Sequence, residues 1–239
     1  LMTGAYAARC GWSKGVVGYK IDSNAGMSPE ALTLADIYKS EGYATGMSGK
    51  WHIGDVGPCR PHVRSFDSAY YIGKSNNQTT KLWRDGELVE DPFSNRMLTD
   101  QFTAEAVTFI KAHKHEPFFC YLPITPPHGM YDIPADDPAW KLYEGEAWIQ
   151  DPSIHQDVKN YAGMVSMVDY NVGQVLDLLK ELGLEENTIV FFTGDNGGQD
   201  RFRSKEHPRG FFGPNKDPAM LSSKDCALIK DSVSLSSAG

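Results

Sequence analysis

Residues 42–52 read G-Y-A-T-G-M-S-G-K-W-H, directly after the apolar stripe of a predicted helix. Gly42 is expected to end that helix, and residues 43–48 are expected to form a short strand. In extended backbone, residues two positions apart point to the same side of the chain. Lys50 and His52 are therefore expected to face one pocket, with a fixed cation and a titratable ring suited to an anionic ester. The same stretch also fits an ordinary turn with a surface lysine and a structural histidine.

The rest of the sequence repeats this order of helix and then strand. The predicted units are a helix from residue 28 with a strand at 43–48, a helix from residue 99 with a strand at 118–122, and a helix at 158–182 with a strand at 188–193. Ser28 is expected to cap the first helix, with Pro29 in its first turn. Gly183 is expected to end the last helix. The alternation predicts an α/β fold with a mostly parallel sheet flanked by helices.

Three further segments interrupt that pattern. Residues 82–89 predict a β-hairpin that turns at Asp85-Gly86 and forms an excursion from the main sheet. Residues 126–152, rich in Pro, Asp, Trp and Tyr, predict a long ordered loop of the kind that is often functional. Residues 219–239 are rich in serine and follow no recognisable pattern.

Composition excludes several classes of protein. The net charge is −8 without any block dense in Lys and Arg, which argues against a nucleic-acid surface. The sequence contains no run of eighteen apolar residues, so it predicts no membrane-spanning helix. The four cysteines lack the spacing of a structural zinc site. The opening residues L-M-T-G do not resemble a signal peptide, and we expect the chain to be part of a longer protein.

Each predicted strand is followed at once by polar residues. Lys50 and His52 follow the first strand, His128 follows the second, and Asp195-Asn196 follow the third. Ligands of open α/β sheets bind beyond the carboxyl ends of the strands, so these groups are expected to converge. Asp195 and Asn196 offer the hard oxygen ligands that Ca²⁺ or Mg²⁺ prefers, although Asp-Asn-Gly-Gly is also strong turn chemistry. His128 also fits the role of a structural loop histidine.

Four stretches together resemble one known family. Residues 42–52 match the pattern G-Y-x-T-x-x-(small)-G-K-W-H at every fixed position, and residues 188–198 resemble T-(apolar)-F-T-x-D-N-G. Thr3-Gly4 resembles the T-G that closes a first signature, several residues after its C-x-P-S-R, and Pro127-His128 resembles a substrate-contacting histidine. The chain is similar over about residues 1–215 to the sulfatases, whose fold belongs to the alkaline phosphatase superfamily.

The resemblance implies a sulfuric ester hydrolase with a formylglycine nucleophile and a calcium ion. It implies that Asp195 and Asn196 are calcium ligands and that Lys50 bridges the nucleophile and the sulfate. His52 would manage the proton of the formylglycine hydroxyl, and His128 would bind a sulfate oxygen. The implied substrate is a small-molecule or carbohydrate sulfate ester, and a formylglycine-generating or sulfatase-maturating enzyme is an expected partner. The implied location is periplasmic, secreted or lysosomal.

The sequence departs from the family pattern in two places. The C-x-P-S-R signature does not occur, and Cys10, in C-G-W-S-K, lacks its Pro and Arg and follows Thr3-Gly4 instead of preceding it. The late segment with a second catalytic lysine is not matched, and Lys216 stays unassigned. We therefore expect residues 1–218 to be a partial N-terminal sulfatase domain, incomplete at both ends and inactive alone, followed by an unmatched tail at 219–239. The alternatives are a phosphate or phosphonate ester hydrolase of the same superfamily and a catalytically inactive anion-binding module.

Overall fold

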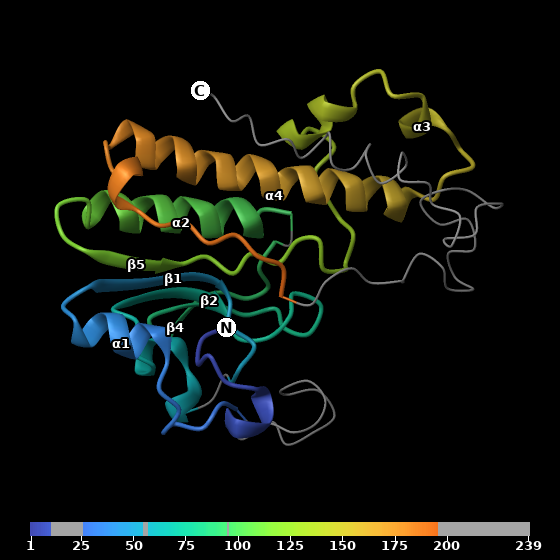
Figure 1. The fold of residues 1–239 in the computed structure, drawn as a ribbon. Helices are drawn as coiled ribbons and strands as arrows, with labels where there is room; N and C mark the ends of the chain where they lie inside the picture. The colour runs from blue at the N-terminus through green and yellow to red at the C-terminus, as the bar shows by residue number, and fades with distance from the viewer. Residues whose placement is uncertain (11–25, 55–56, 95, 196–239) are drawn as a thin grey trace. The chain divides into compact units, whose positions relative to one another are not determined.

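The computed structural model describes residues 1–10, 26–54, 57–94 and 96–195 (Figure 1). It divides into two compact units, the first comprising Leu1–Leu142 with Asn160–Phe191 and the second comprising Tyr143–Lys159 with the chain from Phe192 onward. The predicted ligand Asn196 and the predicted tail at 219–239 lie outside the described residues.

The first unit contains a five-stranded sheet in the order β4-β3-β2-β1-β5. Its strands are β1 (Ala44–Lys50), β2 (Ser68–Ile72), β3 (Leu82–Arg84), β4 (Glu87–Glu90) and β5 (Phe118–Tyr121). β1 pairs in parallel with both β2 and β5, whereas β2, β3 and β4 pair antiparallel. The hairpin turns at Asp85-Gly86 as predicted. The expectation that it leaves the main sheet was wrong, because β3 pairs directly with β2.

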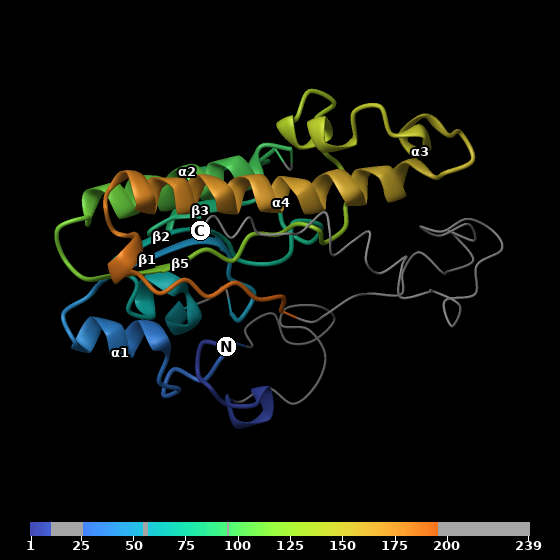
Figure 2. The ribbon, with the colours of Figure 1, turned by 45° about the horizontal axis from the view of Figure 1, so that its top comes forward.

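Helices cover both faces of this sheet, which confirms the predicted α/β fold with a sheet flanked by helices. The sheet is mixed and not mostly parallel, because β3 and β4 join it antiparallel. α1 (Leu34–Ser40) packs on one face, and α2 (Leu98–Ala112) packs on the other (Figure 2). The part of α4 (Gln156–Glu181) that follows residue 160 packs on α2 through Leu178 and Leu179, which cluster with Phe109 and Ile110. None of the described helices has the combination of length and apolar content that a membrane crossing requires.

Shorter helical segments connect these elements. The second unit contains α3 (Ala147–Gln150) and the first four residues of α4. Segments of 3-10 helix lie at Ala7–Cys10, Gly57–Cys59, Pro61–Val63, Pro138–Tyr143 and Glu185–Asn187. The predicted long loop at 126–152 therefore contains short helices in its second half.

The first helix begins later than the sequence predicted. Residues 28–31 form a turn in which Ala31 N–H donates to Ser28 O at 3.0 Å, and α1 begins at Leu34. Thr33 caps it in a reciprocal capping box: its hydroxyl accepts from Asp36 N–H at 3.2 Å, and its own N–H donates to Asp36 Oδ2 at 2.8 Å. The predicted stop at Gly42, with φ of +82°, is confirmed.

Close packing of α2 on β1 depends on a glycine. A Cβ added at Gly46 would lie 2.6 Å from the ring of Phe109, so no larger residue fits beneath the helix. Two positions later, the buried Ser48 hydroxyl donates to Phe102 O at 2.8 Å. The glycine and the serine thus let α2 approach the middle of β1 closely.

The third predicted strand does not form. Residues 188–193, all within the described chain, have no strand pairing, and the side chains of Ile189 and Phe191 are 81% and 84% exposed. An apolar, β-branched run needs a neighbouring strand to satisfy its backbone groups, and no strand in the described sheet pairs with it. The prediction of a buried strand here was therefore wrong.

Candidate active site

The parallel register brings the carboxyl ends of β1, β2 and β5 to one edge of the sheet. Lys50 is the last residue of β1 and lies opposite Ile72, the last residue of β2. On the other side, Lys50 N–H donates at 2.7 Å to the carbonyl of Pro123, just beyond β5. His128 follows Pro123 by five residues. Two of the three predicted polar groups, at 50–52 and at 126–129, therefore leave the same edge of the sheet.

The contact between these two strand ends requires glycine at position 49. Gly49 has φ of +146°, which L side chains rarely adopt, and an added Cβ would lie 2.3 Å from Pro123 O. Glycine therefore allows the backbone of β1 to approach the segment that follows β5, immediately before Lys50.

His52 lies beyond the end of β1, and its backbone is not extended. Its φ is +52°, in the left-handed region, so the alternation that predicted a shared face for Lys50 and His52 does not hold past the strand. The N–H groups of Trp51 and His52 donate to Ile72 O at 3.0 Å and Gly73 O at 3.2 Å. These bonds fasten the segment after β1 to the segment after β2.

The indole of Trp51 anchors the same segment from the inside. Its side chain is 4% exposed, and Nε1 donates to the carbonyl of Cys59 at 2.7 Å. Burial raises the pKa of the Cys59 thiol, although the charge of Arg64 opposes the shift. Cys59 is therefore a packing residue of this region and not a thiolate nucleophile.

The sequence interpretation missed polar residues that follow β2. Ser75 is 2% exposed, and its hydroxyl oxygen lies 3.3 Å from His52 Nδ1; the next residue, Asn76, is also buried. A usable sequence pattern was present, because the run S-A-Y-Y-I at 68–72 is aromatic and apolar and is followed by G-K-S-N-N. The rule of a strand followed by polar residues therefore applies to β2 as well.

His128 has one ring nitrogen committed to the backbone. Its Nδ1 lies 2.7 Å from Gly129 O, and because a carbonyl only accepts, Nδ1 carries the hydrogen. In the neutral ring, Nε2 is then an acceptor. Nε2 donates a hydrogen bond to an anion only when both ring nitrogens carry a hydrogen. The backbone N–H of His128 donates to Thr125 O at 3.0 Å, which closes a turn after β5.

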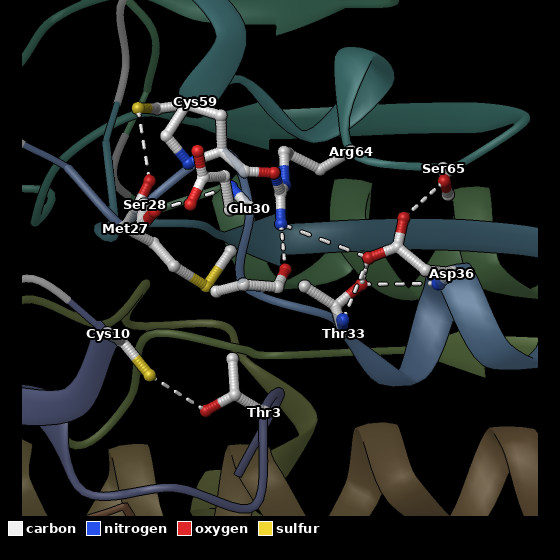
Figure 3. A network of polar contacts seen from close by, with 12 residues as sticks. Thr3, Cys10, Met27, Ser28, Glu30, Thr33, Asp36, Cys59, Arg64 and Ser65 are labelled. Atoms are coloured by element: carbon white, nitrogen blue, oxygen red, sulfur yellow. Dashed lines mark hydrogen bonds and ion pairs between the residues drawn. The ribbon is translucent and has the colours of Figure 1, made fainter.

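A polar network supports the segment that precedes α1 (Figure 3). The buried Arg64 donates through its two terminal nitrogens to the carbonyls of Pro29 and Ala31, and it lies 3.8 Å from Asp36 Oδ2. Burial by itself would raise the pKa of Asp36, but hydrogen bonds from Ser65 and Thr33, together with the Arg64 charge, outweigh it and lower the pKa. The carboxylate therefore stays ionised as the centre of this network.

This network is linked to the segment that carries His52. Met27 N–H donates to the carbonyl of Ile53, the residue after His52, at 2.8 Å, and Cys59 Sγ lies 3.4 Å from Met27 O. Residues 27–36 thus contact and stabilise the chain where it leaves β1. The two segments are far apart in sequence, so only the folded chain brings them together.

The two predicted metal ligands, Asp195 and Asn196, stay a prediction. Asp195 is exposed and belongs to the second unit, and Asn196 lies outside the described residues. Within the described parts of the chain, no three His, Cys, Asp or Glu side chains gather closely enough to hold an ion. Asp and Asn oxygens suit calcium, but two ligands do not complete a shell of six to eight.

Comparisons with known proteins point to one family. The sequence profile described as Sulfatase matches residues 1–216. The chain is 27% identical over 219 residues to an arylsulfatase of Hemicentrotus pulcherrimus, covering 82% of this chain and 37% of that protein. It is 30% identical over 188 residues to an N-acetylgalactosamine-6-sulfatase of Sus scrofa, covering 71% of this chain and 33% of that protein.

The fold of the chain is also similar to that of solved structures. The crystal structure of Ps i-CgsB has a TM-score of 0.64 at 27% identity, covering 78% of this chain and 44% of that one. A second structure of the same protein contains k-i-k-neocarrahexaose. The chain therefore spans less than half the length of these relatives.

Proposed function

Because the chain belongs to the sulfatase family, we propose that the whole protein hydrolyses sulfate monoesters. The observation that carries the proposal is the shared edge of the sheet, where Lys50 and His52 leave β1 beside the segment that leads from β5 to His128. A lysine and two histidines at one strand edge supply the charge and the proton transfer that an anionic ester requires.

The three residues have different roles in this proposal. The Lys50 ammonium stabilises negative charge on the sulfate oxygens, an interaction that strengthens as charge develops in the transition state. His52 moves a proton to or from the nucleophile's hydroxyl. His128 donates from Nε2 to a sulfate oxygen and is therefore a charged imidazolium when it binds, because its Nδ1–H is committed to Gly129 O.

Two parts of the proposed machinery are not complete within the described residues. The nucleophile is proposed to be a formylglycine in a C-x-P-S-R signature, which these 239 residues do not contain. A formylglycine-generating or sulfatase-maturating enzyme would produce it, and the proposed location is periplasmic, secreted or lysosomal. Asp195 and Asn196 are proposed to supply two oxygen ligands of a calcium ion. The described residues do not by themselves complete the site of such an ion.

The proposed substrate class is a carbohydrate sulfate ester. Support comes from two relatives, the N-acetylgalactosamine-6-sulfatase and the Ps i-CgsB structure that contains an oligosaccharide. A panel of sulfated monosaccharides and sulfated galactan oligosaccharides, with release of inorganic sulfate as the readout, tests this class. Release of sulfate from an aryl sulfate but from no sugar would refute it.

The test of the activity itself compares a sulfate ester and a phosphate ester that have the same leaving group. The purified whole protein is expected to hydrolyse 4-nitrophenyl sulfate and to leave 4-nitrophenyl phosphate largely intact. The opposite preference would support the alternative of a phosphate ester hydrolase, and hydrolysis of neither ester nor any sulfated sugar would support the inactive anion-binding module. Lys50→Ala tests the site. Lys39→Ala is its matched control, because Lys39 pairs with Asp67 at the opposite end of β1.

A further inference from the structure

The chain that follows His128 contacts helix α4 through a side-chain amide. Asn160 Nδ2 donates to the carbonyl of Tyr131 at 2.8 Å, and the rings of Tyr131 and Tyr161 form an edge-to-face pair with centroids 5.9 Å apart. Residue 131 lies in neither a helix nor a strand, so its carbonyl depends on a side chain or on solvent for a hydrogen bond. All of these residues belong to the first compact unit. Residues 131–133 are called the anchored segment below.

Two further contacts involve the anchored segment. Ile133 is 5% exposed and packs on α4 where that helix has a glycine, because a Cβ added at Gly163 would lie 3.0 Å from Ile133 Cδ1. Arg96 Nε donates to both carboxylate oxygens of Asp132, at 3.1 and 3.0 Å. This ion pair is largely exposed to solvent, so it contributes little to stability. The burial of Ile133 and the bond from Asn160 are therefore the main anchors.

The orientation of the His128 ring depends on the anchored segment through one carbonyl. His128 Nδ1 donates to Gly129 O at 2.7 Å. Gly129 is buried but has no side chain to fix it, and the side chain of Met130 is 48% exposed. Asp132 N–H donates to Met130 O at 3.0 Å and closes a turn onto the anchored segment. The position of Gly129 O is therefore set by the residues that follow it, which are fastened to α4.

We propose that Asn160 is a positioning residue that acts through the His128 ring. Its amide holds the carbonyl of Tyr131 and thereby keeps Gly129 O in place to accept the Nδ1 hydrogen. The ring then has one orientation and one neutral tautomer. Without this anchor, Gly129 O would move, the Nδ1 hydrogen would bond water, and the neutral ring would adopt either tautomer. The inference rests on the proposed function only for what Nε2 binds.

The state of the ring is measured by ¹⁵N NMR of the whole protein labelled only at histidine nitrogens. The His128 signals are identified by their absence in His128→Gln, and the spectra are recorded at alkaline pH, where histidine rings are neutral. In the wild type, Nδ1 is expected to show the shift of a protonated nitrogen. Asn160→Ala is expected to move that shift toward the value of an unprotonated nitrogen, because the two tautomers mix.

Asn171→Ala is the matched control, because it removes an asparagine amide from the same helix. Asn171 is 1% exposed, and its Nδ2 donates to Met167 O at 2.9 Å and to Asp100 Oδ1 at 3.2 Å. Its loss is expected to destabilise the fold at least as much as Asn160→Ala, because a more deeply buried amide is removed. It is expected to leave the His128 shifts unchanged, and urea unfolding compares the stability of the two variants.

The kinetic test separates an action through His128 from a general loss of stability. In the sulfate ester assay, Asn160→Ala is expected to raise KM by about three- to tenfold, the scale of one hydrogen bond, with kcat within about threefold. The effect falls on KM because a group that binds a sulfate oxygen already acts before the transition state. In a His128→Gln background, the same substitution is expected to change KM by less than about twofold.

Three results would overturn the inference. The first is an Asn160→Ala protein whose His128 shifts equal those of the wild type. The second is an Asn171→Ala protein whose His128 shifts move as far as those of Asn160→Ala. The third is an effect of Asn160→Ala on KM that is undiminished in the His128→Gln background. The first two are independent of turnover, so a protein that hydrolyses no sulfate ester but shows the expected shifts would refute the proposed function and leave the positioning role intact.

Discussion

Gly49→Ala is the sharpest structural perturbation available beside the candidate site. The new Cβ would lie 2.3 Å from Pro123 O, whereas real Cβ contacts essentially never fall below 3.0 Å, so the backbones must separate by about 0.7 Å. That movement stretches the bond from Lys50 N–H to Pro123 O, now 2.7 Å. The residue must also keep φ of +146°.

The two costs can be estimated separately. A side chain held in a backbone region reserved for glycine costs about 1–3 kcal/mol, and overpacking in a tight site costs about 1–3 kcal/mol. The sum, about 2–6 kcal/mol, is a large fraction of the roughly 5–15 kcal/mol that keeps a domain folded. Gly42→Ala is the matched control, because Gly42 also has positive φ but an added Cβ meets nothing within 4 Å. Only the backbone cost of about 1–2 kcal/mol applies there.

Urea unfolding of the whole protein, followed by tryptophan fluorescence, measures the difference between these two variants. Gly49→Ala is expected to unfold at clearly lower urea than Gly42→Ala. Its kcat for a sulfate ester is also expected to fall, because Lys50 is the next residue. Equal unfolding midpoints for the two variants would refute the close approach of β1 and the segment after β5.

Other predictions test the charges. Lys50→Ala is expected to lower kcat by about 10²–10³-fold, as when one charge-stabilising donor is removed, while Lys39→Ala leaves kcat unchanged; a loss under threefold would remove Lys50 from the catalytic set. Because the folded pKa of Asp36 lies below its usual 3.8, its contribution to stability is present above that pH and is lost as pH falls through the folded pKa. The unfolding midpoint of the wild type should thus decrease in acid more than that of Asp36→Asn, and parallel curves would contradict the network. Asp195→Ala is expected to weaken calcium binding to the whole protein by at least about tenfold in isothermal titration calorimetry, and unchanged affinity would exclude Asp195 as a ligand.

The elements that the sequence predicted well are those whose determinants are local. The apolar spacing of the second and third helices and the stop at Gly183 depend on residues within a few turns of one another, and α2 and α4 formed close to their predicted bounds. The β-hairpin was predicted for the same reason, since Asp85-Gly86 adopts the positive φ values that its tight turn requires.

The two errors have different causes. Ser28 and Thr33 are both capping residues, but only Thr33 has an acidic partner three residues later, Asp36, in the local capping-box pattern, and Ser65 and Arg64 from a distant loop also contact that partner. The run at 188–193 has the composition of a strand, but a strand exists only where another strand pairs with it. The sequence contains no local indication of that pairing.

The candidate site divides in the same way. The sequence alone predicted the chemistry, because the spacing of Lys50, His52 and His128 and the match at 42–52 depend only on residue identity. It also predicted Asp195 and Asn196 as oxygen ligands, and that role stays a prediction. The tertiary structure alone decided that Ser75 contacts His52, that Gly49 permits β1 to touch the segment after β5, and that His128 has its Nδ1 hydrogen committed to the backbone. The physical reason is that residue identity fixes which groups can donate, accept or carry charge, whereas strand pairing across long stretches of chain fixes which of them meet.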